Sequence, residues 1–292
     1  MADSITIALD TSVYRQPTAE DIRSAKQYIL QRNDDARTLA GRIDDILEDA
    51  AERIVRICYR YNVNPEEFFI SSQYNEQLMK EIADVMDETE EAIYDLIFEY
   101  AANVTSDKER QTLLIAWMAT LGRGNRNLRD TIDGYLYKTM KDWEAAIAAM
   151  RASELTLAEA ITKIRSFLHN IYTMPEVTKA FKQASSFNAT YIRSKGVMQG
   201  GVGLSNNGST NVTNMAKQTI QMVYMRNQAM EFEDGGAVGY YQLRGSNYNC
   251  DACDEEVGFH PNIQEIYDKP MVHPHCCCYR VPIYANDNIL TE

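Results

Sequence analysis

The sequence predicts a mainly α-helical protein, in which a bundle of long helices precedes a small α+β module at the C-terminus. Apolar residues recur three and four positions apart over residues 18–195, which is the spacing of one face of an α-helix. After residue 235 the pattern changes to two short extended pieces, Val238–Arg244 and Tyr279–Tyr284, separated by glycine, proline and asparagine. We therefore expect a helical domain over residues 1–195, a Gly/Asn-rich loop over 196–210 and a C-terminal module over 211–292.

The first predicted helix begins at Thr18 and keeps one apolar face as far as Tyr61. An apolar face of this length suggests that the helix packs along a partner protein as well as against the core of its own bundle. The face consists of Ile22, Ala25, Ile29, Ala36, Leu39, Ile43, Ile46, Ala50, Ile54 and Ile57.

Start and stop signals divide the rest of the helical region into segments. Asn64 precedes a proline, as at the N-cap and first position of a helix. Capping boxes at Ser106–Glu109 and Thr156–Glu159 each predict the start of another helix. Gly122 interrupts the pattern and Pro175 ends one segment or starts the next. Together these signals predict several consecutive helices rather than one long rod.

Two isolated residues of the helical region could suggest chemistry. His169 has no cysteine or second histidine near it in the sequence, so we expect it to have a packing or surface role. Cys58 lies among apolar residues of the first helix and is best interpreted as a small buried side chain.

The loop over residues 196–210 holds five of the chain's fourteen glycines. Gly200–Gly203 could form a phosphate-binding turn, but no Lys-Ser/Thr pair follows and no apolar strand precedes it. We therefore expect a simple connection. Asn211 or Thr213 can then cap one more helix, from Met215 to about Met230.

Composition and charge narrow the classes of function. Hydrophobic residues make up 45% and charged residues 24% of the 292, which is typical of a globular protein. The net charge is −13, and residues 231–292 hold eleven acidic residues against Arg244, Lys269 and Arg280. DNA-binding modules normally carry the opposite charge, so we expect no sequence-specific nucleic-acid binding. No apolar run is long enough for a membrane span and no secretory signal is recognisable, so we expect no membrane association and a cytoplasmic origin.

The C-terminal module concentrates possible metal ligands. Five of the six cysteines and three of the four histidines fall in the last 43 residues. Cys250-x2-Cys253 is followed after nineteen residues by His273-x2-Cys276. Two such turns facing each other can present four nitrogen or sulfur ligands to one Zn²⁺ ion, at distances of about 2.0–2.3 Å. We predict that a bound zinc ion stabilises this module, which is too small to be stable alone.

The second half of this site offers more donors than one zinc ion needs. In an extended chain Cys276 and Cys278 point to the same side and Cys277 to the other. Disulfides are disfavoured in a reducing cytosol, so metal binding is the preferred interpretation. The predicted ligands are Cys250, Cys253, His273 and Cys276, with Cys278 as the alternate.

The surplus of ligands favours a closed, structural zinc site. A catalytic zinc would keep one position open and would need a base nearby, for which Glu255, Glu256 and His260 are the candidates. Solvated surface is the commoner role for such acidic residues. We therefore expect no catalytic residues, and a zinc-dependent enzyme is the alternative.

The C-terminal module resembles the Mu F-like head morphogenesis proteins, also called minor head proteins, of tailed bacteriophages. The resemblance covers roughly residues 235–283 and extends weakly back to about residue 190. It rests on Gly239–Cys253 with its Cys-x2-Cys, on Gly258, and on Pro270–Pro282 with its His-Pro-x-Cys-x-Cys followed by an apolar strand. Two positions depart from the family's pattern, since Ala216–Thr219 replaces an Arg-Thr-Glu triplet and Cys277 replaces an arginine.

The resemblance implies a structural virion component rather than an enzyme. Such a protein would lie at or near the portal vertex, act in head morphogenesis and in DNA delivery, and contact the portal protein and neighbouring virion proteins as a multimer. Its expected location is the virion, and the host cytoplasm during assembly. The alternatives are a zinc-dependent hydrolase or nuclease carried in the particle, and a zinc-containing adaptor without a virion role.

Overall fold

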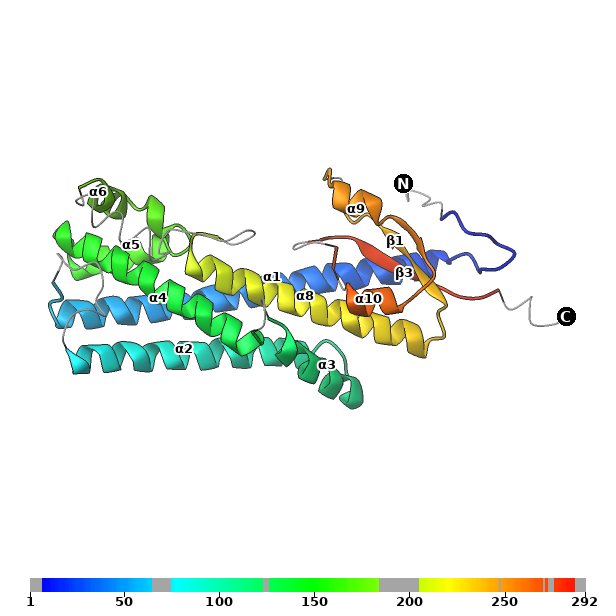
Figure 1. The fold of residues 1–292 in the computed structure, drawn as a ribbon, viewed down its shortest axis with the longest axis horizontal. Coiled ribbons are helices and arrows are strands. Elements are labelled where there is room, and N and C mark those ends of the chain that lie inside the picture. Colours follow the sequence, from blue (N-terminus) through cyan, green and yellow to red (C-terminus); the bar gives the residue numbers. More distant parts are fainter. Residues whose placement is uncertain are drawn as a thin grey trace. The chain divides into compact units, whose positions relative to one another are not determined.

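The protein is described by a computed structural model over residues 7–64, 75–122, 126–183, 205–246, 248–269, 271–272 and 276–286. The predicted fold class is confirmed, because the described chain is mainly helical and carries a small antiparallel sheet near its C-terminus (Figure 1). Within the described ranges, no helix is both long and apolar enough to cross a membrane.

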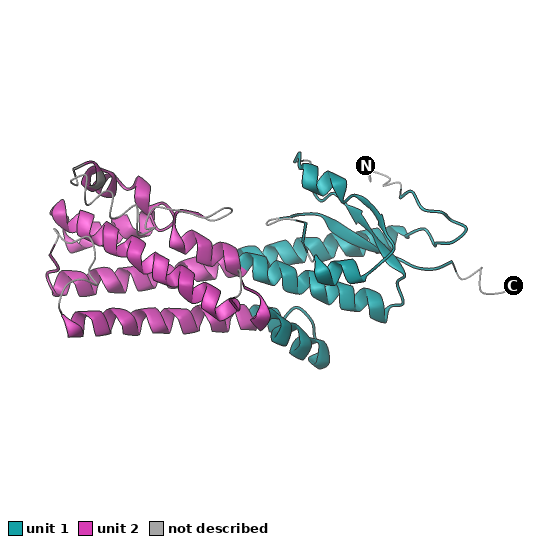
Figure 2. Cartoon of the chain, viewed as in Figure 1, with its two compact units in different colours: residues 1–38, 100–118, 217–292 teal, residues 39–99, 119–216 magenta. Residues whose placement is uncertain are grey.

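The chain forms two compact units, shown in different colours in Figure 2. Unit 1 consists of residues 1–38, 100–118 and 217–292, and unit 2 of residues 39–99 and 119–216. These units divide the chain differently from the predicted domains, because the first 38 residues belong with the C-terminal segments. The predicted domain boundaries themselves stay predictions.

Long helices supply most of both units. Helix α1 spans Ala19–Arg60, α2 Glu76–Ala102, α3 Lys108–Thr120, α4 Leu128–Ala152 and α8 Gly208–Asp234, so that α1, α2, α3 and α8 each contribute residues to both units. Unit 2 adds α5 (Leu157–Ser166), the 3₁₀ helix η2 (Ile171–Thr173) and α6 (Pro175–Gln183).

Several predicted helix starts are found where the sequence places them. Thr156 and Glu159 form the predicted capping box at the start of α5. Thr18 starts α1 as expected, since its hydroxyl accepts a hydrogen bond of 3.1 Å from the Asp21 backbone N–H. The cap of α3 is one residue later than predicted, because Asp107 rather than Ser106 accepts a bond of 3.0 Å from Arg110 N–H.

Helix α8 starts earlier than we predicted. Asn207 caps it, accepting 3.1 Å from Thr210 N–H, so the helix begins at Gly208 rather than at Met215. The predicted caps Asn211 and Thr213 lie inside this helix, and the predicted loop is wrong for residues 208–210. Asn207 already satisfies an N–H that would otherwise lack a partner, which makes an earlier start favourable. The rest of the Gly-rich segment up to Leu204, and the residues after Asn64, lie outside the described residues.

The buried interior of unit 2 contains a carboxylate that joins three segments. Asp142 of α4 is fully buried and accepts hydrogen bonds from Lys138 Nζ and from Gly208 N–H, both at 2.7 Å, and from the Tyr172 hydroxyl. Burial raises the pKa of the Asp142 carboxyl, and the contact with Lys138 opposes that rise. Asp142 therefore ties α4 to η2 and to the start of α8.

The two isolated residues of the helical region have ordinary surroundings. His169 lies 3.1 Å from Asp44 and 3.2 Å from the Thr210 hydroxyl, which suits the packing role expected of it. Cys58 is fully buried, as predicted, and burial raises the pKa of its thiol to about 12.

Unit 1 contains the sheet, whose strand order is β2-β1-β3 with antiparallel pairing throughout. Strand β1 spans Gly239–Leu243 and β3 spans Tyr279–Ile283, which agrees with the two predicted extended pieces. Strand β2, Gly258–His260, was not predicted. Its three residues are too few for an alternating pattern to be recognised in the sequence. Two short helices accompany the strands, α9 (Asp251–Glu255) and α10 (Gln264–Asp268).

The sheet shares its apolar core with helices α1, α8 and α10, of which α1 lies far away in the sequence. Tyr279 and Val281 of β3 pack against Ala25 and Ile29 of α1. A second cluster unites the end of α8 with the sheet and α10, through Ala229, Phe232, Tyr240, Ile263 and Ile266. The C-terminal segment is thus stabilised by α1 and α8 in addition to any metal.

Candidate metal centre

Three cysteines of unit 1 converge on one point. The Sγ atoms of Cys253, Cys276 and Cys278 all lie within 4.8 Å of one another, and all three residues are buried. The Sγ atoms of Cys253 and Cys276 are 3.7 Å apart. Cys253 belongs to α9, whereas Cys276 and Cys278 belong to the segment that leads into β3. The predicted clustering of C-terminal cysteines is therefore present.

A fourth cysteine, Cys250, packs against this cluster from the N-cap position of α9. Its carbonyl accepts hydrogen bonds from Cys253 N–H at 3.0 Å and from Asp254 N–H at 2.9 Å, which closes the Cys-x2-Cys turn. One turn of helix thus brings Cys250 and Cys253 to the same side of α9. Of the first predicted pair, only Cys253 is among the residues whose Sγ atoms lie within 4.8 Å of one another, and Cys250 packs beside them.

The second half of the predicted ligand set is described only in part. Cys276 is in the cluster as predicted, and Cys278, the predicted alternate, joins it. His273 and its neighbour His275 lie outside the described residues. Among the residues that the structure describes, Cys278 is therefore the better supported partner of Cys276. Alternation of side chains along an extended chain explains this pair, as the sequence suggested.

A glycine allows the two cysteine-bearing segments to approach each other closely. A Cβ atom on Gly245 would lie 1.6 Å from the carbonyl oxygen of Cys277, a distance that no side chain can tolerate. Gly245 follows the end of β1, and Cys277 lies between the two clustered cysteines. Any other residue at position 245 would push the Cys276–Cys278 segment away. No signal in the sequence marks Gly245, because its role depends on the backbone of Cys277, which lies far from it in the chain.

An arginine connects the turn formed by Cys250–Cys253 to the sheet through a hydrogen bond. Arg244, at the end of β1, donates a hydrogen bond of 3.2 Å from Nη1 to the Cys250 carbonyl. It also donates to the Tyr248 carbonyl and forms an ion pair with Asp254. The positive charge of Arg244 is thus balanced by a carboxylate within the same turn.

Two thiols of the cluster, those of Cys253 and Cys278, have raised pKa values. Burial, together with the neighbouring Cys276, raises the pKa of Cys253 to about 12. The pKa of Cys278 is raised by its hydrogen bond with Cys276 and by burial. Buried thiolates so close to one another repel, unless a cation lies between them. A divalent cation would displace these protons and would be held by sulfur alone or by sulfur and nitrogen.

The donor chemistry fits a soft or borderline metal ion. Several cysteine sulfurs at one buried point are typical of zinc and iron–sulfur sites, whereas calcium and magnesium require oxygen ligands. The cluster is therefore a possible metal site based on Cys253, Cys276 and Cys278, with Cys250 beside them.

Two of the three candidate catalytic bases, His260 and Glu256, are engaged in other contacts, and Glu255 is exposed. His260 stacks on Tyr240 with ring centroids 4.7 Å apart, and its Nε2 lies 2.9 Å from the Glu256 carbonyl oxygen. Its Nδ1 lies 2.9 Å from a carboxylate oxygen of Glu265. The Glu256 carboxylate pairs with Lys269, which lowers the pKa of Glu256. These contacts hold β2 against α9 and α10.

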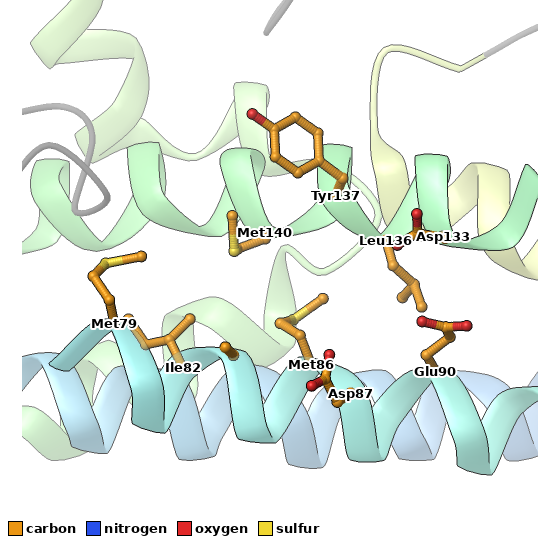
Figure 3. A pocket seen from close by; sticks show the side chains of 10 residues that line it. Met79, Ile82, Met86, Asp87, Glu90, Asp133, Leu136, Tyr137 and Met140 are labelled. Carbon is orange, nitrogen blue, oxygen red and sulfur yellow. The ribbon is translucent and has the colours of Figure 1, made fainter. Parts of the chain in front are cut away.

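A second feature, in unit 2, is an open groove of about 250 Å³ between α2 and α4. Figure 3 shows Met79, Met86 and Ile82 of α2 on the side that faces Met140 of α4, and Tyr137 of α4 also lines the groove. Its other lining residues are Ala83, Leu136 and the acidic Asp87, Glu90 and Asp133. Flexible methionine side chains adapt to different apolar surfaces, and the carboxylates favour a positively charged occupant.

No protein-family model, curated protein or solved structure matches the chain. The fold and the site define a mainly helical protein with a small cysteine-bearing sheet module.

Proposed function

We propose that this chain is a minor head protein of a tailed bacteriophage, a structural component of the particle that binds at or near the portal vertex and acts in head morphogenesis. The observation that carries the proposal is the buried cluster of Cys253, Cys276 and Cys278 beside a short antiparallel sheet. These cysteines belong to the motifs on which the resemblance to the Mu F-like family rests.

The proposed role of the cluster is to hold one structural zinc ion. Burial of the cysteines and the absence of a carboxylate from the cluster of described residues support a closed sulfur-rich site. The ion would connect α9 to the segment before β3 and so complete a sheet of only three short strands. Small modules of this kind usually need such a connection.

The partners that we propose are the portal protein and neighbouring virion proteins, with several copies of the chain in each particle. Two kinds of surface support a role in protein interaction. The groove between α2 and α4 is lined by apolar side chains together with three acidic ones. In unit 1, Leu30 of α1 is 68% exposed and Leu113 of α3 is 53% exposed, although both side chains are large and apolar. A position at the portal would also allow a part in DNA delivery.

The alternative is a zinc-dependent hydrolase or nuclease carried in the particle. It would require an open metal position and a base free to accept a proton. The contacts of His260 and Glu256 favour a structural role for both residues. Measuring nuclease and esterase activity of the zinc-loaded chain tests the alternative directly, and activity lost in His260→Ala without loss of stability would favour it.

The proposal is tested on purified particles of the virus that encodes the chain. We expect quantitative mass spectrometry to find the chain in mature heads at low copy number, and co-expression with the portal protein of the same genome to yield a complex. Met86→Asp, which places a charge in the groove between α2 and α4, tests whether this groove contributes. Particles that lack the chain, together with normal head assembly when its gene is interrupted, would contradict the proposal.

A further inference from the structure

Two buried arginines lie beside the cysteine cluster. Arg32 of α1 is 1% exposed, and its Nη2 donates a hydrogen bond of 2.5 Å to the backbone carbonyl of Cys276. Arg280 of β3 is 3% exposed and follows Cys278 by two residues. Both residues line a small cavity of about 10 Å³ together with Cys276 and Cys278. A cavity of this size has room for about one water molecule.

Within the described part of the chain, neither guanidinium group has the carboxylate partner that a buried positive charge usually has. Their hydrogen-bond partners among the described residues are amide, carbonyl and sulfur atoms rather than carboxylates: Asn33, Met225, Cys276, Gln242 and Lys269. The neighbouring basic residues differ, because Arg244 pairs with Asp254 and Lys269 pairs with Glu256. A buried charge without a counter-charge is strongly destabilising.

Two donors at this cavity are also left without an acceptor. Nη1 of Arg280 and Nε2 of Gln242 are buried and have no hydrogen-bond partner within the described part of the chain. The other donors of Arg280 are satisfied, Nε by the Gln242 side-chain oxygen and Nη2 by the Lys269 carbonyl, both at 3.2 Å. The remaining groups that line the cavity include the side chains of Cys276 and Cys278. A protonated thiol is a poor acceptor, whereas a thiolate accepts strong, charge-assisted bonds.

We infer that the metal is held by four thiolates, those of Cys250, Cys253, Cys276 and Cys278, and that Arg32 and Arg280 neutralise the charge of this site. The inference rests on the proposed metal centre and assigns its donor set. Four thiolates around a divalent ion leave two negative charges, and the two guanidinium groups supply two positive ones. Replacing one cysteine by His273 would leave one buried positive charge in excess. Arg32 and Arg280 are thus positioning residues, since Arg32 bonds to the backbone of Cys276 and Arg280 lines the same cavity as Cys276 and Cys278.

The donor set is tested by replacing zinc with Co²⁺ in the full-length chain. The sulfur-to-cobalt charge-transfer absorption counts the thiolates, and the visible bands report the geometry. We expect the wild-type spectrum to be that of a tetrahedral site with four sulfurs. His273→Ala should leave this spectrum unchanged, and Cys278→Ser should weaken the charge-transfer band. A wild-type spectrum typical of three sulfurs and one nitrogen, altered by His273→Ala, would overturn the inference.

The role of the arginines is tested by competition of the full-length chain with a zinc-binding dye. Arg280→Met keeps most of the side-chain volume and removes the charge, so we expect the dissociation constant for zinc to rise roughly 10- to 100-fold. Arg280→Lys keeps the charge and should bind more tightly than Arg280→Met. Arg129→Met, which removes an exposed charge in unit 2, is the matched control and should bind zinc as the wild type does. Equal affinity of all four proteins would contradict the proposed role.

These outcomes separate the inference from the proposals on which it depends. A wild-type chain that binds neither cobalt nor zinc would remove the metal centre and this inference with it. A bound metal with a histidine ligand would remove only the inference. If Arg280→Met does not fold, the comparison of Arg280→Lys with Arg129→Met and the wild-type cobalt spectrum still decide the question. Absence of the chain from virions would overturn the proposed function and leave the donor set unaffected.

Discussion

Arg32 and Cys276 are separated by 244 positions in the sequence, yet the Arg32 guanidinium donates a hydrogen bond of 2.5 Å to the Cys276 carbonyl. This bond joins the N-terminal part of α1 to the segment that carries the cysteine cluster. Tyr279 and Val281 extend the contact through their packing on Ala25 and Ile29. The first helix is therefore part of the C-terminal module's fold.

This relationship predicts that α1 contributes to the stability of the sheet. Ile29 is buried against β3, whereas its neighbour Leu30 is 68% exposed. We expect Ile29→Ala to lower the free energy of unfolding by about 2–4 kcal/mol, because it removes buried methyl groups and leaves a cavity. Leu30→Ala is the matched control and should change it by less than about 0.5 kcal/mol. Urea denaturation measures both, and equal effects of the two substitutions would count against the contact.

Gly245 should be intolerant of even the smallest side chain. Its Cβ would overlap the Cys277 carbonyl oxygen, so we expect Gly245→Ala to lower both the melting temperature and the affinity for zinc. Gly41, inside α1, has nothing within 4 Å of its Cβ position. Gly41→Ala should therefore stabilise the protein by about 0.5–1 kcal/mol, because alanine favours the helix. Calorimetry and dye competition on both variants make the comparison, and an unchanged Gly245→Ala protein would disprove the close approach.

Asp142 should make the stability of the protein depend on pH. Its pKa is raised by burial, so the folded protein binds a proton more tightly at this carboxyl than the unfolded chain does. Protonation of Asp142 therefore adds to the free energy of unfolding as the pH falls from the pKa of the folded state towards the pKa of the unfolded chain, near 3.8. This contribution is absent at neutral pH. Asp142→Asn lacks this titration.

We expect Asp142→Asn to be less stable than the wild type at pH 7, because Lys138 loses its carboxylate partner. The free energy of unfolding of the wild type should exceed that of Asp142→Asn by a growing amount as the pH is lowered towards 4. Chemical denaturation at several pH values measures it, with Asp133→Asn on the exposed side of α4 as the control. A constant difference across this range would mean that Asp142 does not titrate as described.

The thiols should react differently with alkylating reagents. Cys58 is buried and its pKa is raised to about 12, so we expect it to resist modification at neutral pH in the folded protein. Zinc should protect the clustered cysteines, and chelation should make them reactive while Cys58 remains protected. Mass spectrometry of alkylated peptides locates the modified residues. Protection of Cys253 and Cys276 that is the same with and without a chelator would argue against a bound metal.

The sequence predicted those features that depend on local chemistry. The capping box at Thr156 and Glu159, the apolar face of α1 and the two longer strands all depend on residues close together in the chain. The predicted N-cap of α3 was wrong by one residue, because Ser106 and Asp107 are both suitable N-cap residues. Strand β2 was missed because it is only three residues long.

The candidate site was predictable in its cysteines but not in its surroundings. The concentration of cysteines near the C-terminus predicted a cluster, and the structure brings together Cys253, Cys276 and the alternate Cys278. Nothing in the sequence connects Arg32 with these residues, since only the tertiary fold brings α1 to them. Similarly, Gly245 became important only when the backbone of Cys277 was found beside it.

Native mass spectrometry of the full-length chain, purified without chelators, tests the central claim most directly. We predict a mass that corresponds to one zinc ion per chain, and loss of this ion on chelation together with faster hydrogen exchange in α9 and β3. A metal-free mass, with hydrogen exchange in these two elements unchanged when zinc is added, would contradict the account.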